Sequence, residues 1–183
     1  MTKTNGKDPA ALLEQAAPRA ARSAGLLTHV VEVASKLGFN DAPGQALLGL
    51  LPSVGVCGAR EVRVSSLYEI SGKLSSSQID QLGRNLLCDP ITQEYRLDLS
   101  ASSAAFLIGP HWRVEVWPKP QVTDPVGDSV RKAIKDMGLP EPETVRTGTA
   151  YQITGRINQN QVEKITAKLL SNQVIHRTKV SQL

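Results

Sequence analysis

The sequence is poor in cysteine, in aromatic residues and in long hydrophobic stretches. Its 183 residues include two cysteines, Cys57 and Cys88, which are too few for a disulfide framework or a cysteine-rich zinc site. No apolar run reaches the roughly 18 residues of a membrane-spanning helix, so no membrane contact is expected. The polar segment Met1–Lys7 lacks the apolar core of a signal peptide. Together these absences predict a cytoplasmic protein.

The charge distribution argues against a nucleic-acid partner. The net charge is +4 at pH 7, divided as +2 over residues 1–25, −2 over residues 26–100 and +4 over residues 101–183. No segment carries five like charges in a row, and aromatic residues make up 4% of the chain. Because single-strand binders combine a basic groove with stacking aromatic side chains, we expect no nucleic acid among the partners.

The residue types that perform catalysis do not form a recognisable arrangement. The histidines His29, His111 and His176 form no H-x-x-x-H pair that would indicate a metal site. Cys57 lies between glycines without an activating group nearby in the sequence. The glycines match neither a Walker loop nor a dinucleotide fingerprint. A chain without a paired nucleophile and base is a poor candidate for an enzyme acting alone, so we predict no catalytic residue, no metal and no cofactor.

The chain contains an internal repeat. At an offset of 83 residues, residues 31–97 align with residues 114–180 without a gap, and 15 of the 67 aligned positions are identical. A gapless match in which apolar positions stay in phase indicates a tandem duplication. The identical pairs include Glu32/Glu115, Lys36/Lys119, Asp41/Asp124, Gly44/Gly127, Val62/Val145, Arg63/Arg146 and Tyr68/Tyr151.

Each copy begins with a predicted strand and helix. In the second copy, residues 112–117 alternate apolar and polar side chains, the period of a half-buried strand. Asp124 is a candidate N-cap with Pro125 at the first helical position. The apolar stripe that follows indicates a helix ending at Gly138. The first copy repeats this pattern up to Gly55, and Pro52 is expected to kink or shorten its helix.

The rest of each copy is predicted to contain two strands, a helix and a closing strand. In the second copy, a short strand lies around Val145 and a longer one runs through residues 151–157. The next helices open with Ser75-x-x-Gln78 and Asn158-x-x-Gln161, which have the spacing of a capping box. The closing strands are predicted at residues 91–97 and 174–180.

These elements predict an α+β fold of two tandem β-α-β-β-α-β two-layer sandwiches. A copy of about 70 residues buries only a small core, so we expect the copies to pack together as a pseudo-dimer. The predicted divisions are a flexible N-terminal arm at residues 1–25, repeat 1 at residues 26–97, a linker at residues 98–110 and repeat 2 at residues 111–183.

Residues that recur at the same place in both copies are the candidates for partner contact. Arg63 and Arg146 could pair with an acidic group of a partner, or could instead cover an edge strand. Tyr68 and Tyr151 could contact a partner, although aromatic residues with a hydroxyl at the rim are more typical of a core or an interface. The structural motif at the start of the first helix of each copy comprises Asp41, Gly44, Asp124, Pro125 and Gly127.

The order and spacing of three motifs resemble the PurS family, the small subunit of phosphoribosylformylglycinamidine synthase in purine biosynthesis. The motifs in the second copy are Asp124-Pro125-x-Gly127, then Val145-Arg146-x-Gly148, then Leu169-Leu170-Ser171-Asn172-x-Val174-Ile175. The first copy carries a more worn version of the same series. The resemblance covers both copies, roughly residues 29–180.

The resemblance implies a non-catalytic chain within a glutamine-dependent carbon–nitrogen ligase complex. PurS-like chains pair as dimers and bridge the large synthase subunit to the glutaminase subunit that releases ammonia. The tandem repeat looks like such a dimer fused into one chain, as a subunit or as the N-terminal domain of a longer synthase. A further pairing into a homo-dimer is compatible with this arrangement. We expect one copy to face the glutaminase and the other the synthase body.

The chain departs from the family pattern at one motif, and the sequence also leaves an alternative function open. The family often has a lysine after the Val-Arg-x-Gly segment, whereas this chain has Ser66 and Thr149 there, with Ser65 in place of the first glycine. If that lysine contacts a partner in relatives, this chain lacks the residue for that contact. The alternative function is a tandem α+β regulatory module that binds a small molecule between its copies.

Overall fold

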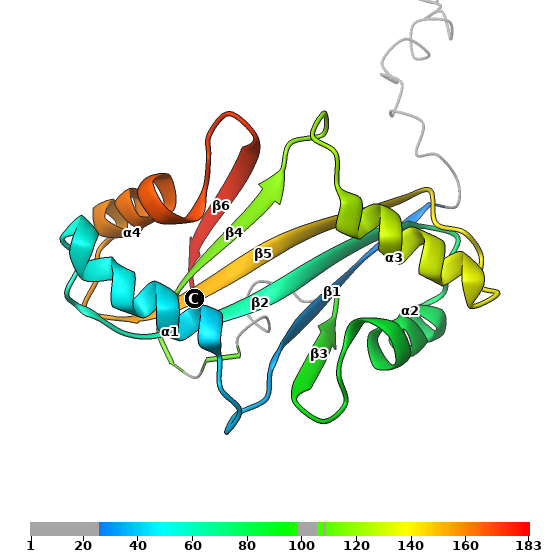
Figure 1. Ribbon diagram of the computed structural model, residues 1–183, viewed down its shortest axis with the longest axis horizontal. Coiled ribbons are helices and arrows are strands. Elements are labelled where there is room, and N and C mark those ends of the chain that lie inside the picture. The colour runs from blue at the N-terminus through cyan, green and yellow to red at the C-terminus, as the bar shows by residue number, and fades with distance from the viewer. Residues whose placement is uncertain (1–25, 99–105, 108) are drawn as a thin grey trace, which may run out of the picture.

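Six strands form one continuous antiparallel sheet in the computed structural model, which describes residues 26–98, 106–107 and 109–183. The predicted arm at residues 1–25 and most of the predicted linker lie outside the described residues. The strands follow the order β3-β1-β2-β5-β4-β6 (Figure 1). Their bounds are β1 Leu27–Ser35, β2 Ala59–Gly72, β3 Gln93–Leu97, β4 Trp112–Pro118, β5 Thr144–Gly155 and β6 His176–Gln182.

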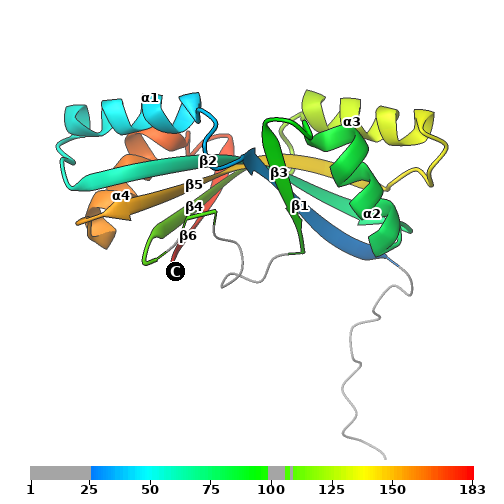
Figure 2. The same ribbon diagram turned by 90° about the horizontal axis from the view of Figure 1, so that it is seen from below.

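Four α-helices cover one face of this sheet (Figure 2). They are α1 Ala42–Leu50, α2 Ser76–Leu82, α3 Pro125–Asp136 and α4 Gln159–Ile165. A 3-10 turn at Leu51–Val54 follows α1, and π-helical turns at Gly83–Leu87 and Thr166–Leu170 follow α2 and α4. The predicted α+β fold with a sheet layer and a helix layer is confirmed. The opposite side of the sheet is called the open face below.

The helices begin where the sequence predicts, and the first helix of each copy also ends as predicted. Asp124 caps α3 with Pro125 in its first turn, and Gly138 follows the helix with a φ of 73°. Both predicted capping boxes are present, at Ser75 for α2 and at Asn158 for α4. Helix α1 ends at Leu50 because Pro52 has no N–H to continue the ladder.

The two middle strands predicted for each copy are one long strand. β2 and β5 pair with each other from Ala59 to Ser71, whereas β1 pairs only with the second half of β2. Where β2 extends beyond its pairing with β1, β5 of the other copy is its hydrogen-bonding partner, so β2 continues as one strand. Ser66 lies opposite Thr149. Because these positions are equivalent in the repeat, the pseudo-two-fold axis passes between them.

The two copies exchange their first helices. α1 packs over strands β4 and β5 beside α4, where Leu47 and Leu51 share a hydrophobic core with Val114 and Ile153. Reciprocally, α3 places Ile134 in the core formed by β1, β2 and α2. Each core therefore contains side chains of both copies. The predicted pseudo-dimer is confirmed in this intertwined form (Figure 1).

Candidate partner-binding site

The two arginines proposed for partner contact lie in different environments. Arg63 is buried, and its guanidinium donates to the Ser35 carbonyl and lies 3.8 Å from the Asp41 carboxylate. Arg146 is half-buried on the open face. It lies opposite Glu69 in the register of β2 and β5. Of the two, Arg146 is the one whose side chain a partner can reach.

The two tyrosines pack on the helix side of the sheet, near the pseudo-two-fold axis. Tyr68 packs against one core and Tyr151 against the other. Burial raises the pKa of both phenols, and a hydrogen bond from the side chain of Ser66 or Thr149 opposes the rise. These tyrosines lie under the helix layer, and contact with a partner stays a prediction for both of them.

The repeated Asp-x-x-Gly motif joins each first helix to the long strand. Asp124 accepts the Gly127 N–H at 2.8 Å and the Thr147 N–H at 2.6 Å. Asp41 makes the equivalent pair of bonds, to Gly44 at 3.0 Å and to Val64 at 2.8 Å. A Cβ on Gly44 or Gly127 would lie 2.3 or 2.6 Å from a carbonyl oxygen of the strand. In both copies the motif therefore fixes the start of the helix against the long strand.

Among the described residues, the side chains that could perform catalysis or bind metal are dispersed. No group of three or more histidine, cysteine or acidic side chains is close enough to hold a metal ion in the described part of the chain. His29 contacts Asp98 at 2.5 Å, and His111 contacts the Gly109 carbonyl at 2.7 Å. No helix among these residues is long and apolar enough to cross a membrane.

Two equivalent turns expose an apolar side chain at the start of each closing strand. Ile91 is 72% exposed and Val174 is 78% exposed. In each turn a side-chain oxygen accepts the backbone N–H of the residue two positions later. Asp89 accepts from Ile91 and Asn172 accepts from Val174, both at 2.9 Å. A lysine repeated in both copies donates to a carbonyl of the same turn. These tips are apolar, are held by the hydrogen bonds of their turns, and are related by the pseudo-two-fold axis.

The predicted closing strands include Ile91 and Val174, whereas β3 and β6 each begin two residues later. Asp89 and Asn172 carried the signal that was missed, because Asp and Asn hydrogen-bond the backbone two residues on and so favour turns over strands. The repeated lysines carried a second signal. Lys36 donates to the Pro90 carbonyl at 2.5 Å, and its equivalent Lys119 donates to the Gln173 carbonyl at 2.7 Å.

A cleft lies beside each of these turns, and the two clefts are equivalent in the repeat. The cleft of the first copy measures about 270 Å³ and contains Lys36, Cys88 and Glu94 in its lining. The cleft of the second copy measures about 410 Å³ and contains the equivalent residues Lys119, Ser171 and Arg177. The change from Glu94 to Arg177 reverses the charge at one position of the lining. Arg84 lines only the first cleft and Glu163 only the second, so the two linings have the same formal net charge and differ in where the charges lie.

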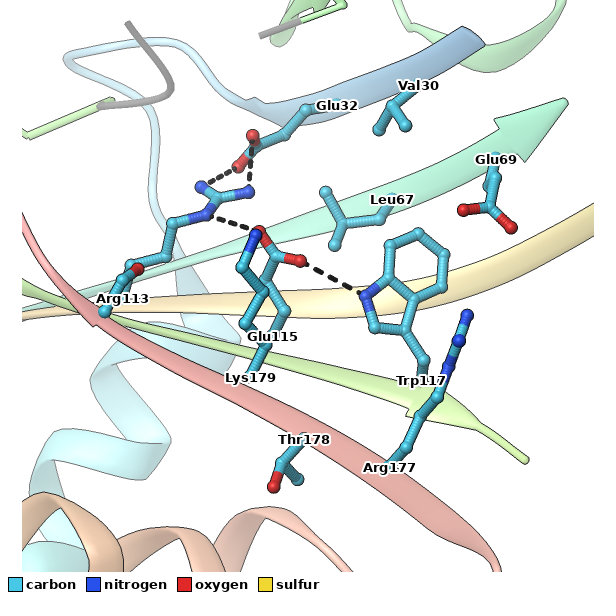
Figure 3. A pocket seen from close by; sticks show the side chains of 11 residues that line it. Val30, Glu32, Leu67, Glu69, Arg113, Glu115, Trp117, Arg177, Thr178 and Lys179 are labelled. Atoms are coloured by element: carbon cyan, nitrogen blue, oxygen red, sulfur yellow. Dashed lines mark hydrogen bonds and ion pairs between the residues drawn. The ribbon is translucent and has the colours of Figure 1, made fainter. Parts of the chain in front are cut away.

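The open face contains a buried ion pair between the two copies. Arg113 on β4 donates two hydrogen bonds of 2.9 Å to the carboxylate of Glu32 on β1, across the two intervening strands (Figure 3). Both side chains are at most 5% exposed. Burial disfavours the charge on Arg113, but its bonds to Glu32 and Glu115 outweigh burial and raise its pKa. Sequence analysis did not find this pair because each residue lies alone within an alternating strand.

Comparison with known proteins gives both copies the same assignment. The family model of PurS, described as phosphoribosylformylglycinamidine (FGAM) synthase, matches residues 28–101 and again residues 111–182. No curated protein matches the chain.

Solved structures of PurS chains are also similar. The Methanocaldococcus jannaschii PurS, one of the subunits of formylglycinamide ribonucleotide amidotransferase in the purine biosynthetic pathway, is 25% identical over 41% of this chain and 96% of its own, with a TM-score of 0.37. The B. subtilis PurS is 28% identical over 41% of this chain and 99% of its own, with a TM-score of 0.38. The Thermotoga maritima PurS subunit of phosphoribosylformylglycinamidine synthase is 23% identical over 41% of this chain and 93% of its own, with a TM-score of 0.35. The assignment rests on the family model, which covers well over half of the chain: the chain belongs to the PurS family of FGAM synthase in purine biosynthesis, in a tandem form.

Proposed function

We propose that this chain is a non-catalytic bridging component of FGAM synthase that joins the synthase subunit to the glutaminase subunit for ammonia transfer. The observation that carries the proposal is the pair of equivalent clefts whose linings have diverged in charge at Glu94 and Arg177. A chain that bridges two different proteins needs two docking places of different chemistry. A fused pseudo-dimer supplies them from one framework.

The exposed tips beside the clefts support the same proposal. An apolar side chain held at a fixed position by a structured turn loses little conformational freedom on binding, and such side chains often dominate an interface. Ile91 is the tip of the first copy and Val174 the tip of the second. We infer that one tip contacts the glutaminase subunit and the other the synthase subunit.

The proposal is tested by reconstitution with the large synthase subunit and the glutaminase subunit. The chain alone should give no turnover. Added to the two subunits, it should raise the glutamine-dependent rate of FGAM formation while the ammonia-dependent rate changes little, because ammonia supplied from solution needs no bridge. Equal glutamine-dependent rates with and without the chain would contradict the proposal.

Two variants test the assignment of the tips. Ile91→Asp and Val174→Asp should each weaken binding of one subunit by about tenfold or more, since truncating a contact of more than about 1.4 kcal/mol has that effect. Val126→Asp is the matched control, because Val126 is an exposed valine in the first turn of α3, away from both clefts. Pull-down of each subunit separately measures the effect. Loss of the same subunit with both variants would contradict the assignment of one tip to each partner.

A further inference from the structure

Phe106 and Leu107, two described residues between the two copies, lie on one half of the open face. The backbone N–H groups of Phe106 and Leu107 both donate to Oε1 of Gln152, at 3.0 and 3.1 Å. The guanidinium of Arg96 lies 4.3 Å from the centre of the Phe106 ring. Both connecting residues are buried, at 5% and 6% exposed. This half of the face therefore holds a short peptide segment through two backbone bonds and one aromatic side chain.

The pseudo-two-fold axis gives the open face an equivalent half that no described segment covers. The repeat relates Gln152 to Glu69 and Arg96 to Lys179. Glu69 and Lys179 both line a cavity of about 380 Å³ on this second half, with Val30, Leu67 and Trp117 as apolar lining (Figure 3). The place that Phe106 and Leu107 occupy on one half thus corresponds to a cavity on the other.

Three charged side chains of this cavity have no partner in the part of the chain that the structure describes. The side chains of Glu69, Arg177 and Lys179 form no hydrogen bond or ion pair with any described residue. A carboxylate at position 69 can accept the two N–H groups that Gln152 accepts through its amide oxygen, and charge-assisted bonds of this kind are the stronger ones. Lys179 and Arg177 can place a cation against an aromatic ring, as Arg96 does for Phe106.

We propose that this cavity binds an extended segment of a partner protein that carries an aromatic residue, in the way that the open face already binds Phe106 and Leu107. Backbone bonds would hold the segment and the apolar lining would select its aromatic side chain, a common mode of peptide recognition. A peptide segment is favoured over a second sheet as the ligand. Phe106 and Leu107 cover the neighbouring half of the open face, so a second flat sheet could not pack against both halves.

The proposal adds a third contact to the proposed function and is tested without either synthase subunit. The probe is a peptide with the sequence of residues 103–110, SAAFLIGP, titrated to millimolar concentration against the whole chain. Binding is followed by NMR through the indole N–H of Trp117. We expect saturable shifts of this signal, and at least tenfold weaker binding of the same peptide with alanine in place of phenylalanine.

Variants of Glu69 separate this binding mode from non-specific contact. Glu69→Leu should weaken binding at least tenfold because the backbone acceptor is lost, whereas Glu69→Gln should retain it because glutamine is the residue at the equivalent position. Lys168→Ala, on the exposed side of the helical turn after α4, is the control and should bind as the unchanged chain does.

Three results would overturn the proposal. They are the absence of binding at millimolar peptide, equal binding by Glu69→Leu, and self-association of the chain through this face. Because reconstitution of FGAM synthesis is measured separately, failure of the peptide leaves the bridging function standing, and failure of reconstitution leaves the peptide site standing.

Discussion

Replacement of Arg113 by methionine is the perturbation whose effect the structure defines most closely. The Glu32 carboxylate is 1% exposed and accepts two hydrogen bonds of 2.9 Å from Arg113. Arg113→Met would leave this carboxylate buried, with the Ser65 hydroxyl as its remaining side-chain donor. Breaking a buried pair by removing one partner costs about 3–5 kcal/mol. We expect Arg113→Met to lower the free energy of unfolding by that amount.

The double variant distinguishes a buried charge from lost packing. In Glu32→Met/Arg113→Met, no charge of the pair remains and the volumes stay similar, while the loss of the Arg113 bond to Glu115 is common to both variants. The double variant should therefore recover most of the stability that Arg113→Met loses. Urea denaturation measures both effects. With an m value of about 2 kcal/mol/M, the single variant moves the midpoint by about 1.5–2.5 M.

A double-mutant cycle supplies the refutation. If Arg113→Met and the double variant lowered the free energy of unfolding equally, the unpaired Glu32 carboxylate would carry no energetic penalty. The argument from burial would then be wrong. Arg84→Met is the control, because Arg84 forms an ion pair with Asp80 that is exposed to solvent. That variant should leave the midpoint unchanged, since surface pairs contribute little.

Two further predictions concern the repeated framework. Gly44→Ala should destabilise the chain by about 1–3 kcal/mol in urea denaturation, because its Cβ would lie 2.3 Å from the Val62 carbonyl oxygen; Gly49→Ala in the same helix meets nothing within 4 Å and should stabilise it by about 0.5–1 kcal/mol. The Ile91 N–H and neighbouring donors hold the pKa of Asp89 below its usual 3.8, so hydrogen-exchange protection of the Ile91 amide should be present above pH 3.8 and be lost as the pH falls through the lower, folded value. Asp89→Asn, which copies the second repeat, should retain that protection at every pH; loss of protection in this variant would contradict the turn geometry.

The sequence was sufficient to predict the repeat, the fold class and the starts of the helices. The repeat follows from comparing the sequence with itself, whereas the helix starts follow from local rules. Asp124 caps α3 through Gly127, three residues away, and Ser75 does the same for α2 through Gln78. A cap or a turn is determined within one helical turn of the chain, so an unaligned sequence contains the whole of its cause.

The exchange of helices and the length of the middle strands were not predictable in the same way. β2 continues as one strand because β5 of the other copy hydrogen-bonds it from Ala59 onward. No periodicity within residues 59–72 reports that partner. The ion pair between Glu32 and Arg113 has the same character, since it joins residues 81 positions apart in the sequence. These features depend on how the copies associate, and local propensity does not encode that association.

The departure at Ser65, whose equivalent Gly148 keeps the glycine of the motif, has a physical reason that only the structure supplies. A Cβ on Gly148 would lie 2.6 Å from the Trp117 ring, so a bulky residue at position 117 requires glycine opposite it. In the first copy the equivalent of Trp117 is Ala34, and Ser65 can then carry a side chain, which it uses to bond Glu32. The two positions have therefore changed together in each copy.

Fusion of the two copies is what permits such one-sided features. In a dimer of identical chains, an arginine at the position of Arg113 would occur twice, and the bond to Glu32 would be repeated about the axis. Here the equivalent of Arg113 is Val30, so one pair exists where symmetry would make two. Residues identical in both copies, such as Asp41 and Asp124, build the framework. The ion pair, the charge reversal between Glu94 and Arg177, and the cavity on one half of the open face all depend on positions at which the copies differ, and these positions are where different partners can be distinguished.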